Sequence, residues 1–468
     1  MARRSGIRTI ALFSALLVTA SRAETPPARS AVAIVGVSVI DVEHGRSVGP
    51  RTVVVADGRI VAVTLPRDAV IPESARRVSG RGRFLIPGLV DMHVHLFNRI
   101  SKRAPNAWAF PLFIANGVTG VREMNADAGS MAQVRDWRRR MHAGELLAPH
   151  ILAVGIAVSG TSPDDAAHQT RAAAAAGADF IKVFSGVPAA NWHSIVTAAR
   201  TASLRVAGHV PAGVSLLAAS AAGQHTNEHL TQAVEACSSR EAPLLHAREH
   251  LAADALTAVR DRQEQAALAD YDATLCATVA AELARDGQAQ VPTQILAYTE
   301  SRALPAEPDE DPRWRYLRSD ERARWLRILA GRPTRPDAPA SARWQAARRI
   351  VGQFHRAGVP ILAGTDAPMP LVYPGFSLHE ELALLVDSGL SPREALRAAT
   401  FTPAAVLGVA SSSGSVAVGK RADLVLLDGD PTKDIRNTRR IRAVLIDGRL
   451  LLRAELDAAL STAATRQQ

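Results

Sequence analysis

Two histidines separated by one residue, His93 and His95, end the apolar run of residues 84–95. Side chains at positions i and i+2 of a strand point to the same face, so both imidazoles leave the strand side by side. Two converging neutral imidazoles suit a divalent metal ion. The alternative is a pair of polar histidines at a strand end, and the motif alone does not decide between the two.

Further ligand-type residues also lie at the ends of short apolar segments: Lys182, His209, His229 and Asp366. Each alone has a structural explanation, as a snorkelling lysine, a buried core histidine or a helix-capping aspartate. The spacing from Lys182 to His209 and on to His229 is close to one βα unit. Because the carboxyl ends of barrel strands build the active site, all six candidates are predicted to meet at one mouth.

Lysine is rare in this chain, at positions 102, 182, 420 and 433 among 55 basic residues. A lysine placed where a strand opens to the site indicates a need for an amine that can lose its proton, which arginine cannot do. One such use is reaction with carbon dioxide to give a carbamate that could bridge two metals.

The middle of the chain alternates short apolar strands with helical stretches, which favours parallel βα units. The strands are expected at residues 84–96, 119–124, 150–155, 180–184, 205–210, 225–230, 290–296 and 360–367. This predicts an α/β fold with a (β/α)8 TIM barrel over residues 84–412. Residues 298–343, rich in Pro, Arg and acids, are either an insertion at the active-site rim or a solvated helical face.

Both ends of the chain are rich in β-strand signals. Asp57-Gly58 and Asp447-Gly448 are hairpin turns. Residues 31–83 and 413–455 are therefore predicted to form one composite β-sandwich domain, with 456–468 as a C-terminal tail. His379 and Glu380 follow the last barrel strand; a helix start facing the barrel is favoured over a border of the substrate pocket.

Residues 1–23 have the pattern of a secretory signal peptide, which predicts a periplasmic or secreted protein. No other run is long enough to span a membrane. Cys237 and Cys276, the only cysteines, could pair or stay free thiols. The net charge is +10, but the arginines are scattered, so we expect no nucleic-acid partner. A homo-oligomer is left open.

The chain resembles the metal-dependent amidohydrolase superfamily, in the branch of imidazolonepropionase-like and secreted Xaa-Pro dipeptidase-like enzymes. The matching segments are residues 84–95, 117–122, 177–185, 364–366, 377–382, 398–404 and 419–425. The resemblance implies that His93, His95 and Asp366 bind one metal, that His209 and His229 bind a second, and that carbamylated Lys182 bridges them. Zinc is the expected metal.

The resulting hypothesis is a hydrolase acting on carbon–nitrogen bonds, with a small-molecule substrate. A hydroxide shared by two metals attacks an amide carbonyl, and Asp366 shuttles the proton to the leaving nitrogen. The resemblance and the export signal favour a dipeptide or an N-acyl amino acid. The alternatives are a deaminase or cyclic-amide hydrolase and, as a non-enzyme, a secreted metal-binding protein on a decayed barrel.

Overall fold

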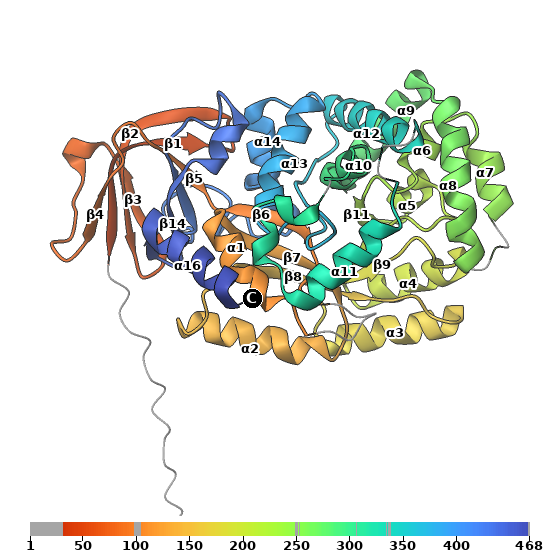
Figure 1. Cartoon of the computed structure of the whole chain (residues 1–468), viewed down its shortest axis with the longest axis horizontal. Helices are drawn as coiled ribbons and strands as arrows, with labels where there is room; N and C mark the ends of the chain where they lie inside the picture. The colour runs from red at the N-terminus through yellow and green to blue at the C-terminus, as the bar shows by residue number, and fades with distance from the viewer. Residues whose placement is uncertain are drawn as a thin grey trace, which may run out of the picture.

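The computed structural model describes residues 31–97, 104–248, 251, 253–305, 307–333, 335 and 338–466. The predicted signal peptide, residues 1–23, lies outside this part of the chain. Figure 1 shows a sheet built from both ends of the chain beside a larger α/β body.

The terminal sheet is mixed and follows the order β15-β14-β13-β5-β1-β2-β3, with β4 paired to β1. The red-orange strands of the N-terminus and blue β14 lie together in Figure 1. The strands are β1 (Val32–Asp41), β2 (Arg46–Ala56), β3 (Arg59–Thr64), β4 (Arg76–Ser79), β5 (Phe84–Pro87), β13 (Leu424–Leu427), β14 (Ile441–Ile446) and β15 (Arg449–Leu452).

This sheet curves until β3 meets the segment that leads into β13. The Ile60 N–H donates to the Lys420 carbonyl at 2.9 Å, and the Gly419 N–H donates to the Ile60 carbonyl at 2.8 Å. Alternate side chains of both halves, including Ile34, Val53 and Leu445, then share one buried core. The period-two pattern at each end of the sequence is thus explained by a single enclosed apolar layer.

The barrel sheet is parallel and follows the order β12-β11-β10-β9-β8-β7-β6. Its strands are β6 (Leu89–Val94), β7 (Val118–Ala126), β8 (His150–Ala157), β9 (Phe180–Val183), β10 (Arg205–Gly208), β11 (Gln224–Glu228) and β12 (Ala289–Val291). Every residue of β6 is buried, as expected for a strand covered on both faces.

Residues 360–367 occupy the eighth position of the barrel. The Leu362 N–H donates to the Gln290 carbonyl at 2.9 Å, and the Asp366 N–H donates to the His93 carbonyl at 2.7 Å. The segment therefore joins β12 to β6 through isolated bridges. The predicted TIM-barrel fold with a small β domain from both termini is confirmed.

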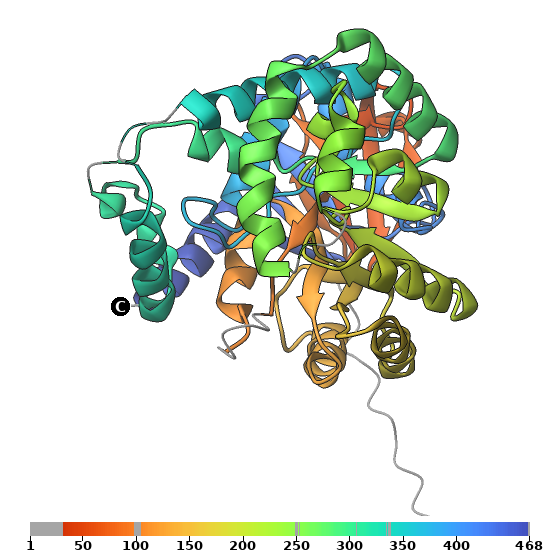
Figure 2. The ribbon, with the colours of Figure 1, turned by 90° about the vertical axis from the view of Figure 1, so that its right-hand side faces the viewer.

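The helices surround the strands, as Figure 2 shows from the side. They are α1 (Phe110–Ala115), α2 (Ser130–His142), α3 (Pro163–Ala176), α4 (Ala189–Thr201), α5 (Leu216–Ala221), α6 (Ala233–Ala236), α7 (Glu241–Arg248), α8 (Ala253–Ala269), α9 (Ala273–Asp286), α10 (Gln294–Glu300), α11 (Ser319–Ala330), α12 (Ala338–Arg356), α13 (Phe376–Asp387), α14 (Pro392–Ala398), α15 (Phe401–Val406) and α16 (Arg453–Arg466). None of these described helices is both long and apolar enough to cross a bilayer.

The largest errors in the predicted strand bounds are at 84–96 and 290–296. The run 84–96 is two strands, because β5 pairs with β13 and β1 in the terminal sheet while only β6 enters the barrel. The predicted strand 290–296 ends at Val291. Pro292 follows, Thr293 has a positive φ of 44°, and α10 begins at Gln294. Proline cannot donate to a strand partner, so the ladder stops there.

The structure also describes two features that the sequence left undecided or placed outside any element: the two cysteines and the C-terminal residues. Cys237 and Cys276 are paired in a disulfide that connects the end of α6 to α9. Residues 456–466 of the predicted tail belong to α16, which buries Leu456 and Ala463 and lies beside α1 in Figure 1.

An ion cluster joins the barrel to the terminal sheet. The His150 Nε2 at the start of β8 lies 3.3 Å from Asp423 Oδ1 and 3.5 Å from Asp447 Oδ1. Burial opposes protonation of His150, but the two carboxylates outweigh it, and Arg421 offsets them only in part, so its pKa is raised above the ordinary 6.5.

We expect this cluster to make stability depend on pH. A raised pKa in the folded state means that the stabilising contribution is complete below pH 6.5 and disappears as pH rises through the folded-state pKa. The His150→Gln variant should therefore lose the corresponding step in thermal unfolding measured from pH 5.5 to 9. His168→Gln, at an exposed position on α3, serves as the control; an unchanged step in His150→Gln would contradict the assignment.

Candidate metal centre

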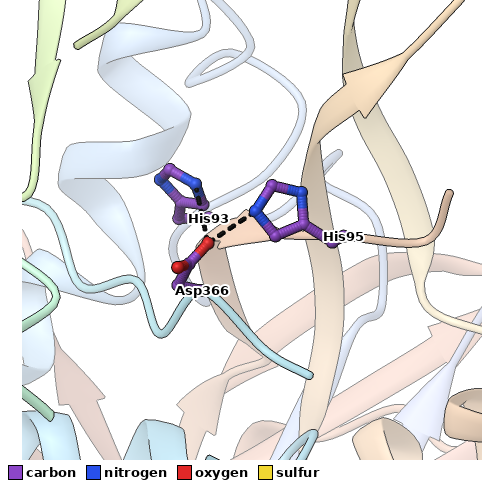
Figure 3. A group of neighbouring side chains, drawn as sticks. All are labelled: His93, His95 and Asp366. Atoms are coloured by element: carbon purple, nitrogen blue, oxygen red, sulfur yellow. Dashed lines mark hydrogen bonds and ion pairs between the residues drawn. The ribbon is translucent and has the colours of Figure 1, made fainter. Parts of the chain in front are cut away.

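His93, His95 and Asp366 form a cluster of ligand-type atoms, shown in Figure 3. The His95 Nε2 lies 2.5 Å and the His93 Nε2 lies 3.1 Å from the same Asp366 oxygen, Oδ1. One ligand atom from each residue lies within 4.8 Å of the others. Burial opposes ionisation of Asp366, but the two histidines hold its pKa well below the usual range, so it is a carboxylate.

The close approach of β6 and residues 360–367 brings these three residues together. A Cβ on Gly364 would lie 2.6 Å from Val291 Cγ1 and 3.0 Å from His93 Cβ, so only glycine fits there. Asp91, two residues before His93, accepts from the Thr365 backbone at 3.0 Å and the Thr365 hydroxyl at 2.6 Å. The Asp366 backbone is thereby fixed against the strand that carries both histidines.

Lys182 lies on β9, after a helix with defined ends. Ser162 caps α3 with Pro163 at its first position, and Gly177 ends the helix in the left-handed region at φ 90°. The Lys182 side chain is fully buried. Within the described part of the chain, its Nζ has no hydrogen-bond partner. Burial lowers the pKa of this amine to about 8.

His209 and His229 follow β10 and β11. The centroids of their rings are 4.9 Å apart, and the centroid of the His229 ring lies 4.5 Å from that of the His93 ring. The His209 Nδ1 lies 2.8 Å from the Ser185 hydroxyl, and the His229 Nδ1 lies 2.7 Å from the Thr293 hydroxyl. Burial lowers the pKa of both imidazoles, to about 3 for His229. Both are thus neutral, the form that binds metal.

A cavity of about 730 Å³ opens beside these histidines. His209, His229 and Ser185 line one side of it. The other side is lined by Thr299, Glu300, Arg302, Leu304, Gly331, Arg332, Pro333, Arg335, Ala340 and Arg343. The segment 298–343 therefore contributes to the border of the site. This agrees with its interpretation as an insertion at the active-site rim rather than a solvated helical face. His379 does not line this cavity; it lies 2.9 Å from the Thr438 hydroxyl and 3.0 Å from the Asn116 carbonyl. Glu380 pairs with Arg313.

A buried ion pair behind His93 was not predicted from the sequence. The Glu228 carboxylate lies 2.7 Å from His93 Nδ1 and accepts from Arg122 Nη2 at 2.8 Å. Burial opposes its ionisation, but Arg122 and His93 keep its pKa below the ordinary value. The position of Glu228, directly before His229 in the sequence, was the one available signal. This contact fixes the His93 ring and leaves Nε2 facing Asp366.

We expect Glu228→Gln to weaken both folding and metal binding. The uncharged amide would leave the Arg122 guanidinium buried without its counter-ion, at a cost of about 3–5 kcal/mol in unfolding free energy. Loss of such a supporting contact typically lowers metal affinity by about 10–100-fold. Denaturant unfolding and metal titration measure the two effects, with exposed Glu43→Gln as the control. Unchanged values in Glu228→Gln would contradict this role.

The residues fit a divalent metal centre. Imidazole nitrogens and a carboxylate are a donor set suited to Zn²⁺ and related ions. Three of the histidines place one ring nitrogen against a supporting oxygen: His93, His209 and His229. Lys182 contributes a buried amine whose Nζ has no hydrogen-bond partner among the described residues and whose charge acts on both His209 and His229.

A family model described as the amidohydrolase family matches residues 84–451 of the chain. This chain belongs to the amidohydrolase family. The resemblance seen in the sequence motifs is confirmed, as is the predicted enzyme class, a hydrolase acting on carbon–nitrogen bonds. Amidohydrolases are typically metal-dependent, in agreement with the clustered ligand-type residues.

Curated relatives of this amidohydrolase match over short stretches. It is 40% identical over 95 residues to an imidazolonepropionase of Syntrophobacter fumaroxidans, which is 19% of this chain and 20% of that protein. It is 40% identical over 65 residues to a dihydroorotase of an Anaeromyxobacter species, 12% of this chain and 14% of that protein. The matches thus span a fifth or less of the relatives' length.

Solved structures match over nearly the whole amidohydrolase. A putative prolidase from Bifidobacterium longum aligns with a TM-score of 0.64 at 23% identity, covering 93% of this chain and all of that one. A Xaa-Pro dipeptidase with bound methionine aligns with a TM-score of 0.61 at 19% identity, covering 90% of this chain and all of that one. Because both identities are below 25%, the likeness supports the fold alone.

Proposed function

We propose that this amidohydrolase cleaves the amide bond of a dipeptide or an N-acyl amino acid, with two divalent metal ions as cofactor. The observation that carries the proposal is the cluster of His93, His95 and Asp366 together with the buried Lys182 amine, which has no hydrogen-bond partner among the described residues and interacts with the Asp366 charge. His209 and His229 join this cluster to the cavity. The whole-length likeness to prolidase and dipeptidase folds agrees with such a substrate class.

The residues have separate roles in this proposal. His93, His95 and Asp366 would hold one ion, His209 and His229 the other, and zinc suits both sets. When bound, the ions supply a water of lowered pKa and polarise the amide carbonyl. Asp366, kept ionised by its two histidines, takes the proton of the attacking water and returns one to the leaving nitrogen.

Lys182 is proposed to carry a carbamate. With a pKa of about 8, about a tenth of the amine is neutral at pH 7. The neutral nitrogen forms a bond to the carbon of carbon dioxide, one C=O electron pair moves to oxygen, and the nitrogen releases a proton. The product is a carboxylate-like anion in a buried position that otherwise leaves the lysine Nζ without a partner.

We also propose that the protein works outside the cytoplasm, in the periplasm or beyond. The pattern of residues 1–23 supports export. The Cys237–Cys276 disulfide fits an oxidising compartment. Fractionation of cells that make the full chain, with mass measurement of the mature N-terminus, tests this; a cytoplasmic protein with an intact N-terminus would contradict it.

Hydrolysis of a cyclic amide is the second candidate. The local similarity to imidazolonepropionases and dihydroorotases favours it. The two activities differ in their products, because a linear amide gives two fragments whereas a ring opens to one molecule that is heavier by one water.

The test is a substrate screen on residues 24–468 loaded with zinc. Dipeptides and N-acyl amino acids are incubated in parallel with cyclic amides, and the products are identified by mass. We expect two fragments from linear substrates and no turnover after treatment with a chelator. Ring opening alone would favour the second candidate, release of ammonia would indicate a deaminase, and inactivity toward all classes would overturn the proposal.

A further inference from the structure

The wall of the cavity that faces His209 and His229 comes from the segment 298–343. It contains four arginines: Arg302 after α10, Arg332 and Arg335 between α11 and α12, and Arg343 on α12. A substrate held at the metal ligands would extend toward this basic wall, because both surfaces line one continuous cavity.

The acidic residues of the cavity do not balance these arginines. Glu235 forms an ion pair with buried Arg248, whose Nη2 lies 2.9 Å from Glu235 Oε1. Glu300 is shared between Arg332 and Arg343 at 3.7 and 3.9 Å. If Glu264 and Glu300 each neutralise one arginine, the four arginines of the wall still leave an excess of positive charge.

The guanidinium groups are also placed to receive an anion. The side chains of Arg332 and Arg343 are only 22% and 29% exposed, so bulk water screens them incompletely. Arg302 is held over the Tyr298 ring at 5.2 Å, with its Nη1 3.2 Å from the tyrosine hydroxyl. Guanidinium groups bind carboxylates through paired N–H donors.

Resting on the amide hydrolysis proposed above, we propose that this arginine wall selects substrates whose leaving amino acid carries a second carboxylate. The α-carboxylate of any C-terminal residue can occupy one guanidinium. The remaining positive excess suits the side chain of a C-terminal aspartate or glutamate. The substrate class is therefore an acidic dipeptide or an N-acyl aspartate or glutamate.

The test compares an N-acyl glutamate with the N-acyl glutamine that has the same acyl group. These substrates have nearly the same shape and differ in one charge. We expect kcat/KM to be higher for the glutamate substrate by about tenfold or more, as for a charge-assisted contact. Arg332→Gln and Arg343→Gln should remove most of this preference through a raised KM, whereas Arg327→Gln, exposed on α11 and outside the cavity, should keep it. Equal kcat/KM values in the wild type would overturn the proposal.

Binding of the free products separates this proposal from the proposed reaction. Calorimetry should show tighter binding of glutamate than of glutamine to the zinc-loaded protein, and the difference should disappear in Arg332→Gln. Selective glutamate binding without turnover would refute only the amide hydrolysis. Equal binding of the two amino acids would refute the acidic specificity whether or not amides are cleaved.

Discussion

Replacement of Asp366 by asparagine is expected to abolish turnover, with kcat falling by about 10²–10⁴-fold, the usual share of a positioned acid–base group. Asparagine keeps the shape and one ligand oxygen but can neither accept the proton of the attacking water nor return it. Because His93 and His95 remain, the variant should keep part of its metal. Steady-state kinetics on the best substrate, with metal content measured on the same sample, provides the result.

The control is Asp428→Asn, which removes a carboxylate from a pair with Arg83 in the terminal sheet. It should retain wild-type kinetics. Activity of Asp366→Asn within a few-fold of the wild type would show that another group moves the proton.

Replacement of Lys182 by alanine is expected to lower kcat/KM by about a hundredfold or more, because the buried anion that would help to hold the metal ions is lost. The truncated side chain leaves space in a fully buried position. Short carboxylic acids such as acetate or propionate can enter that space and supply the missing oxygens. Activity should therefore return in part with added carboxylate, in a saturable manner.

Lys433→Ala, at an exposed position, is the matched control and should neither lose activity nor respond to carboxylates. A Lys182→Ala variant that keeps full activity would contradict the proposed role of a Lys182 carbamate as a metal ligand. Loss without rescue, together with normal folding and metal content, would also contradict the carbamate and leave Lys182 a positioning residue.

The six ligand candidates could be proposed from the sequence because each lies near or just after the end of a short apolar segment, and the strand ends of a parallel barrel meet at one edge. Their order along the chain was enough to predict the barrel and its mouth. The same reasoning placed 84–87 wrongly in the barrel, because an apolar run does not reveal where a strand changes partners. β5 leaves the terminal sheet at Gly88, and only the pairing with β13 shows it.

The contacts that support the candidate metal ligands could not be predicted from the sequence. Arg122 and Glu228 lie 106 residues apart and meet only because the barrel brings β7 and β11 to face one interior. The four arginines of the cavity wall occur on helix ends and loops of the segment 298–343, whose path no periodicity determines. The candidate ligands could therefore be inferred from strand ends, whereas the arginines behind the proposed specificity could be brought together only by the structure.

Elemental analysis of residues 24–468 purified without chelator is the most direct test of the proposed binuclear metal centre. We expect about two divalent ions per chain, as a two-metal site requires. About one ion per chain would contradict the bridged pair and move the function toward a mononuclear hydrolase or deaminase. A protein that binds none, even after incubation with zinc, would contradict the account as a whole.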